Sequence, residues 1–128
     1  HFPHSIHLPH EYIPNCVVYT GTHDNNTLQG WIQQEVTSAQ KKNIQQYLQK
    51  RIDWNDAHWD LIQLVQASVG RLAVIPVQDL LGLGQESRVN HPAHQGKNWQ
   101  WRLTFAQMPL LKFEALPRLN ALTCTYGR

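Results

Sequence analysis

Cysteine and long hydrophobic runs are scarce in this sequence, and each shortage excludes a class of protein. The two cysteines, Cys16 and Cys124, lie far apart and outside any C-x-x-C pattern. This spacing excludes a disulfide framework and a cysteine zinc site, and it is typical of a reducing compartment. No apolar run approaches the roughly 18 residues that a membrane helix needs, and no secretory signal is recognisable. We therefore expect a cytoplasmic protein without a membrane partner.

The chain also has little excess of positive over negative charge. Lys and Arg number 11 against 9 Asp and Glu, and the densest basic cluster is only Lys41-Lys42. A nucleic-acid interface needs focused positive charge, so we expect no nucleic-acid partner. With 41% hydrophobic residues among 128, the chain is long enough to bury a core and is expected to be globular. It begins with His1, and we treat it as a piece of a longer protein.

The hydrophobic pattern predicts strands separated by helices. Two short β-rich runs, 16–20 and 72–77, are predicted to be buried strands. Amphipathic helical patterns cover residues 28–40, 41–52, 55–71 and 109–122. Strands joined by long helical connections imply a parallel β/α sheet.

The helix predicted over residues 55–71 has recognisable end signals. Asn55 or Asp56 can cap its first turn, and Gly70 lies where a left-handed residue commonly ends a helix. Pro76 has no N–H to donate, so we expect it at the end of the second strand or at an unpaired position.

Two polar loops, 21–27 and 78–84, directly follow the two predicted strands. In parallel β/α folds the chemistry gathers beyond the carboxyl ends of the strands, so both loops are expected on one rim. His23 and Asp24 in the first loop can form a polar pair aimed into a cleft.

Capping is the competing interpretation of these polar residues. Asp24, Asn25 or Thr27 can satisfy the free N–H groups of the next helix. Asp79, in the second loop, faces the cleft or caps the short helix that follows it. The residues alone leave both alternatives open.

Two further clusters of residues are candidates for binding sites, one for a sugar and one for a metal ion. Residues 90–102 mix amides, a proline, Trp99 and Trp101, and indole faces stack on the apolar faces of sugars. On an extended segment the two tryptophans share one face, although core packing is the commoner role of a tryptophan.

The amino-terminal histidines recur every third residue, but prolines interrupt any regular helix, so we expect no metal site. These histidines are His1, His4, His7 and His10.

Three stretches, in this order, resemble the carboxy-terminal third of the 4-α-glucanotransferases (amylomaltases, or disproportionating enzymes). This is glycoside hydrolase family 77 of the α-amylase clan. The stretches are YTGTHDNNTLQGW, VIPVQDLLGLGQESRVNHP and NWQWR, and LPHEY resembles the segment that precedes them. The resemblance implies an α/β fold, namely about the last two βα units of a (β/α)8 TIM barrel. Residues 16–20 would be the seventh strand and 72–77 the eighth. Residues 1–128 would then form the carboxy-terminal part of the catalytic barrel, without a second domain.

The resemblance also implies an activity. The family transfers an α-1,4-glucan segment to the 4-hydroxyl of a glucose or glucan acceptor with retention of configuration, which requires two displacements. Asp24 matches the clan's third carboxylate, which stabilises the transition state, and His23 matches its sugar-binding neighbour. The other residues expected to contact substrate are Asn25, Asp79, Asn90, Pro92 and Trp99. Maltooligosaccharides and the remainder of the barrel are the implied partners, and no cofactor is implied.

The sequence departs from the family pattern in two ways. Nothing in it corresponds to the nucleophile or the acid/base, so the isolated piece is expected to be inactive. The family's N-x-P-G-T reads Asn90-His91-Pro92-Ala93-His94, so Ala93 replaces a glycine and His94 a threonine on the expected acceptor side. The alternatives are a hydrolase of the α-amylase clan and a non-catalytic glucan-binding fragment.

Overall fold

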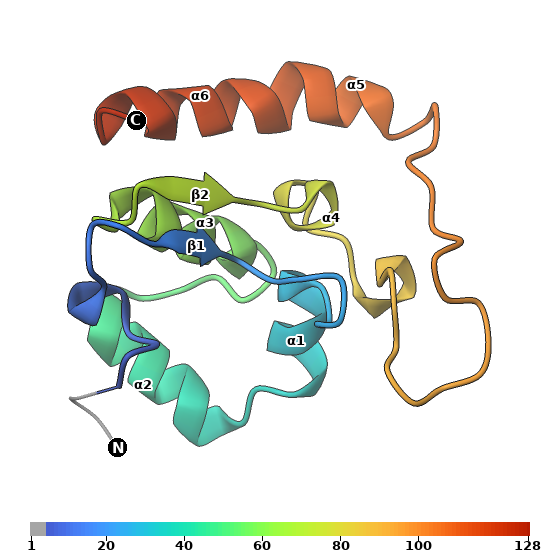
Figure 1. Cartoon of the computed structure of the whole chain (residues 1–128), viewed down its shortest axis with the longest axis horizontal. Coiled ribbons are helices and arrows are strands. Elements are labelled where there is room, and N and C mark those ends of the chain that lie inside the picture. The colour runs from blue at the N-terminus through green and yellow to red at the C-terminus, as the bar shows by residue number, and fades with distance from the viewer. Residues whose placement is uncertain (1–4) are drawn as a thin grey trace.

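A parallel pair of strands lies at the centre of the molecule (Figure 1). The computed structural model describes residues 5–128. Strand β1 (Val17–Tyr19) pairs with β2 (Leu72–Val74), and Val18 lies opposite Ala73. The predicted parallel pairing is therefore confirmed, although both strands are shorter than predicted. Strand β2 ends two residues before Pro76, which cannot donate to a ladder and instead occupies the position before helix α4 (Val77–Leu80).

Of the residues in the two strands, only Val18 in β1 is buried, and Ala73 beside it in β2 is partly exposed. Val18 is 4% exposed, whereas Tyr19 is 50% and Leu72 55% exposed. The prediction that both strands are buried is therefore wrong for β2 and for the exposed face of β1. Side chains alternate along a strand, and no described segment of residues 5–128 buries the side chains of this second face.

The helical patterns over residues 28–40 and 41–52 form two helices, as predicted, but the boundary between them lies earlier in the chain than predicted. Helix α1 (Leu28–Gln34) ends at Glu35, and α2 (Ser38–Leu48) begins after Thr37. Thr37 accepts a bond from the backbone N–H of Gln40, whose side chain binds the Thr37 N–H in return. This capping box starts a new helix inside the pattern that predicted one.

Helix α3 (Ala57–Ala67) confirms the third helical pattern and corrects both of its ends. Asp56 occupies the cap position without a capping side-chain bond. The helix ends at Ser68 in an extended conformation, so Gly70 is not the predicted left-handed terminator. A β-carbon at Gly70 would lie 2.3 Å from Val18 Cγ2, so the strand's close approach is what requires glycine.

The chain ends in a continuous helical segment that lies along β2 (Figure 1). It consists of α5 (Met108–Leu110), a π-helical turn (Leu111–Ala115) and α6 (Leu116–Thr125), longer than the predicted 109–122. Pro117 lacks the N–H that would bond four residues back, and the wider π turn lies immediately before it. Short 3-10 turns occur at Pro9–Glu11 and Gln85–Ser87.

The core has two parts. One joins α3, α4 and the C-terminal helix through Trp59, Ile62, Leu80, Leu81 and Ala115. The other joins α1 to the start of α3 through Ile32, Ile52 and Ala57. No helix within residues 5–128 is long and apolar enough to cross a membrane.

Candidate active site

The two polar segments, 21–27 and 78–84, meet at the carboxyl ends of the strands, as the parallel arrangement predicted, but the start of the second segment is helical and belongs to α4. A pocket of about 520 Å³ opens there. Its wall includes residues of both loops and of the segment after the second loop: Thr22, His23, Asn25, Gln78, Asp79 and Arg88. The end of α4 is fixed by Gly82, whose φ of +62° favours glycine, and a β-carbon there would lie 2.6 Å from His58 Cε1.

Asp24 lies between the lining residues His23 and Asn25 but outside the lining of the pocket itself, and half of its side chain is exposed. Asn90 Nδ2 donates to its Oδ1 at 2.6 Å, and His23 Nε2 lies 3.3 Å from its Oδ2. The carboxylate is thus oriented from two sides while it keeps lone pairs that face solvent. Such a group can accept hydrogen bonds from sugar hydroxyls.

Arg88 holds the two halves of the rim together. Its Nη2 donates to the Asp24 carbonyl at 2.7 Å, and its Nε donates to the Asn90 carbonyl at 2.8 Å. The Asn90 N–H donates in turn to the His23 carbonyl at 3.2 Å. Sequence reasoning missed Arg88, although its place two residues before Asn90 was a signal that it could support that side chain.

The capping question is settled by Thr27. Its Oγ1 accepts a hydrogen bond from the Gly30 N–H at 3.1 Å, so Thr27 caps α1. Asn25 Oδ1 instead accepts bonds from the N–H and hydroxyl of Thr22, which closes the loop on itself. Asp24 takes no part in the cap, and its carboxylate is free for another role.

Asp79 has different surroundings. It is 2% exposed, its Oδ2 accepts from Thr20 Oγ1 at 2.6 Å, and its Oδ1 accepts from the Leu28 N–H at 2.8 Å. It therefore supports the start of α1, and the prediction that it caps the helix after it is wrong because α4 contains it. Burial raises the pKa of Asp79 against the opposing effect of these two hydrogen bonds.

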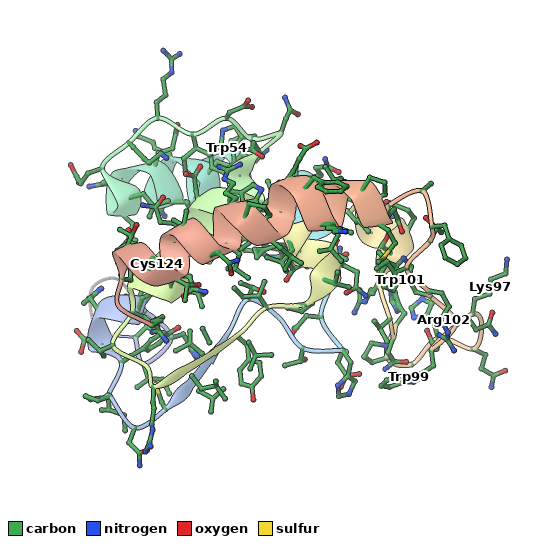
Figure 2. All side chains as sticks on the ribbon, turned by 90° about the horizontal axis from the view of Figure 1, so that it is seen from above. Trp54, Lys97, Trp99, Trp101, Arg102 and Cys124 are labelled. Carbon is green, nitrogen blue, oxygen red and sulfur yellow. The ribbon has the colours of Figure 1, made fainter. Side chains whose placement is uncertain are left out.

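Trp99 lies beside His23, with ring centroids 5.1 Å apart and 57% of the tryptophan exposed. Its φ of +63° departs from an extended strand, so the premise that placed Trp99 and Trp101 on one face is wrong. Figure 2 shows both tryptophans at the end of the molecule that carries Lys97 and Arg102. Pro92 lies in the exposed turn beyond Asn90, where its carbonyl faces His91 and His94.

The amino-terminal histidines are only partly described. His1 and His4 lie outside the described residues. His10 Nδ1 lies 2.8 Å from the hydroxyl of Tyr47. Within residues 5–128, no group of three or more His, Cys, Asp or Glu side chains is arranged to hold a metal ion.

Comparison with known proteins agrees with the resemblance seen in the sequence. The profile of the 4-alpha-glucanotransferase family, glycoside hydrolase family 77, matches residues 1–108. The chain belongs to this family. It is 44% identical to the 4-alpha-glucanotransferase of Solanum tuberosum over 95% of this chain and 21% of that protein. It is 37% identical to the Clostridium butyricum 4-alpha-glucanotransferase over 95% of this chain and 24% of that protein.

A solved structure extends this agreement to the fold. The amylomaltase of Streptococcus agalactiae, solved in complex with acarbose, superposes on 99% of this chain with a TM-score of 0.88 and 31% identity. The chain corresponds to 25% of that protein. It therefore spans a quarter or less of the length of the proteins named here.

Proposed function

We propose that the protein carrying this chain is a 4-α-glucanotransferase, which moves an α-1,4-glucan segment to the 4-hydroxyl of a glucose or glucan acceptor. The observation that carries the proposal is Asp24. In a chain of this family, the carboxylate of the His-Asp pair lies exposed at the end of β1, is oriented by Asn90, and is released from helix capping by Thr27.

The fold we propose for the whole protein is a (β/α)8 barrel. Strands β1 and β2 would be its seventh and eighth strands, and residues 1–128 would belong to its catalytic domain without forming a second one. The parallel pairing and the likeness to an amylomaltase structure support this placement. The remaining strands would cover the exposed face that carries Tyr19 and Leu72.

In the proposed mechanism Asp24 acts on the transition state. Retention requires a carboxylate nucleophile and an acid/base, and both would come from parts of the protein outside this chain. As the sugar ring distorts and positive charge develops at the anomeric carbon, the Asp24 carboxylate would hold the ring hydroxyls and stabilise that charge. Asn90 and Arg88 hold this carboxylate and its backbone in place.

The substrate contacts that we propose follow from exposure. His23 and Trp99 present neighbouring exposed rings, suited to a sugar hydroxyl and a sugar face. Asn25 lines the same pocket as His23, and Pro92, exposed in the turn after Asn90, would contact substrate from that turn. The acarbose bound to the Streptococcus agalactiae protein supports maltooligosaccharides as the ligand class. Asp79 would support the site indirectly, because its carboxylate accepts hydrogen bonds from the Thr20 hydroxyl and the Leu28 N–H. No cofactor enters this mechanism.

We also propose a reducing compartment, because Cys16 and Cys124 are both free. The cytoplasm is the compartment that the sequence suggests. The Solanum tuberosum relative is named as chloroplastic/amyloplastic, and a plastid stroma is an equally reducing alternative.

The test is the product pattern from maltotriose with the full-length protein. A transferase releases glucose and forms longer oligosaccharides, whereas a hydrolase forms only shorter sugars and a glucan-binding protein forms neither. We expect glucose together with longer products, and Asp24→Asn is expected to abolish both in parallel. Shorter sugars alone, or no reaction by the full-length protein, would overturn the proposal.

A further inference from the structure

Helix α1 packs against the 3-10 turn Gln85–Ser87, and Gly30 lies at the point of contact. A β-carbon at Gly30 would lie 2.8 Å from the backbone nitrogen of Gln85, 2.8 Å from Thr27 Oγ1 and 2.4 Å from Asn26 Oδ1. The amide at the end of the Asn26 side chain can turn aside, but a backbone nitrogen moves only with its segment. The φ of Gly30 is not positive, so the close approach of the turn is what requires glycine here.

The turn is joined directly to the residues that orient Asp24. The Arg88 N–H donates to the Gln85 carbonyl at 3.0 Å. Arg88 Nη2 donates in turn to the Asp24 carbonyl, and its Nε donates to the Asn90 carbonyl. Asn90 Nδ2 donates to Asp24 Oδ1. A displacement of the turn is therefore carried through Arg88 and Asn90 to the carboxylate.

The turn is also held from its other side. Ser87 is 4% exposed, and its carbonyl accepts a bond from Gln78 Nε2, which belongs to the buried face of α4. The Ser87 N–H donates to the Gly84 carbonyl at 3.0 Å. A packed interior has little free space, so an added methyl group between α1 and the turn would displace the turn as a unit.

We propose that Gly30 is a positioning residue for Asp24. Its missing side chain sets the distance between α1 and the Gln85–Ser87 turn, and the turn places the Asp24 carboxylate through Arg88. Gly30 is buried and is not among the described residues that line the pocket, so it acts through these neighbours. A misplacement of about 1 Å at a reacting group can lower a rate by roughly 10²-fold. The inference rests on the proposed function of Asp24.

The test compares Gly30→Ala with Gly70→Ala in the full-length protein, with maltotriose as substrate. Both substitutions add a methyl group where another group lies too close, since a β-carbon at Gly70 would lie 2.3 Å from Val18 Cγ2. Gly70 precedes β2, at the end of the strands opposite Asp24. We expect both variants to melt at lower temperature than the wild type. Only Gly30→Ala should lower kcat, by roughly tenfold to 10²-fold with an unchanged KM, because the misplaced group acts on the transition state.

A double-mutant cycle with Arg88→Met tests the route. If Gly30 acts through Arg88, Gly30→Ala should lower kcat in the wild-type background and have little further effect in the Arg88→Met background. A fall by the same factor in both backgrounds would overturn the proposal, and so would a folded Gly30→Ala variant with the wild-type kcat. If Gly30→Ala is too unstable to assay, Gln85→Pro adds a ring carbon to the nitrogen that faces Gly30, at a position in the turn that proline tolerates. An unchanged kcat in Gln85→Pro is equally decisive against the proposal.

A crystal structure of the Gly30→Ala protein gives a readout that does not depend on activity. We expect the bond from Arg88 Nη2 to the Asp24 carbonyl, 2.7 Å in the wild type, to be lengthened or broken. An unchanged bond would overturn this inference and leave the proposed function intact. Wild-type protein that forms no longer oligosaccharides from maltotriose would overturn the proposed function and leave this geometric result unaffected.

Discussion

The segments that follow the two strands carry one carboxylate each, Asp24 in a loop and Asp79 in helix α4, and the two carboxylates have opposite surroundings. Asp24, after β1, has half of its side chain exposed and accepts one side-chain bond, from Asn90. Asp79, after β2, is 2% exposed, and both of its oxygens accept bonds from the protein. Similar placement beyond a strand therefore gives two different roles, because an oxygen committed to protein donors has little left to offer a sugar.

Removing the buried carboxylate should cause the largest loss of stability. Asp79→Ala leaves the Thr20 hydroxyl and the Leu28 N–H without their partner, and we expect the free energy of unfolding to fall by about 2–4 kcal/mol. Denaturant titration of the full-length protein measures the loss. Asp79→Asn, which keeps one acceptor oxygen, should lose less. An Asp79→Ala variant as stable as the wild type would show that α1 does not depend on this carboxylate.

The same carboxylate should give stability a pH dependence. Its pKa is raised above the ordinary value of 3.8, so the folded protein holds this proton at pH values where the unfolded chain has released it. The contribution of Asp79 is therefore greatest below pH 3.8 and declines as the pH rises through the folded pKa. We expect the stability difference between the wild type and Asp79→Asn to shrink from pH 4 to pH 7. A difference that grows over this range would contradict the burial argument.

Asn90→Ala should have an intermediate effect, on catalysis. The family resemblance implied that Asn90 contacts substrate, and loss of such a contact would raise KM, but in the structure Asn90 Nδ2 donates to Asp24 Oδ1. We therefore expect Asn90→Ala to lose about 1–2 kcal/mol of transition-state stabilisation, measured as a lower kcat/KM, and we expect kcat to fall as well. Steady-state kinetics with maltotriose separates the two parameters. A higher KM with an unchanged kcat would mean that Asn90 acts on the substrate and leaves Asp24 unaffected.

The smallest effect is expected in the turn beyond Asn90. Ala93 has a φ of +63°, a conformation that costs alanine more than glycine. Ala93→Gly should raise the free energy of unfolding by about 0.5–1 kcal/mol and leave kcat unchanged. Ala106→Gly is the matched control, since its φ is not positive and glycine there should only destabilise. Equal effects of both substitutions would remove the conformational explanation.

Local patterns in the sequence were enough to predict much of the fold. The two β-rich runs, the helical connection between them and the helical tail follow from hydrophobic periodicity, and the parallel pairing follows from their order. The family followed from three motifs that are long enough to be specific. The boundary between α1 and α2 was predicted after residue 40, later in the chain than it lies, because the capping box of Thr37 and Gln40 was not recognised.

The roles of individual polar residues were harder to predict because long-range pairing decides them. Asp79 binds Thr20 across 59 positions, and Arg88 binds the Asp24 carbonyl across 64 positions. Thr27 and not Asp24 caps α1, and Asp79 accepts the first N–H of that helix, from Leu28. No local pattern in the sequence shows either contact. Candidate carboxylates could be found in the sequence, but the contacts were needed to propose a catalytic role for Asp24 and a structural role for Asp79.

The most direct test of that division measures kcat and the melting temperature of Asp24→Asn and Asp79→Asn side by side in the full-length protein. Both substitutions remove one negative charge and preserve size. We predict that Asp24→Asn lowers kcat by roughly 10³-fold with an unchanged melting temperature. Asp79→Asn should lower the melting temperature and keep most of its kcat while folded. Near-normal turnover in Asp24→Asn, or a collapse of turnover in folded Asp79→Asn, would contradict the assignment of the two carboxylates.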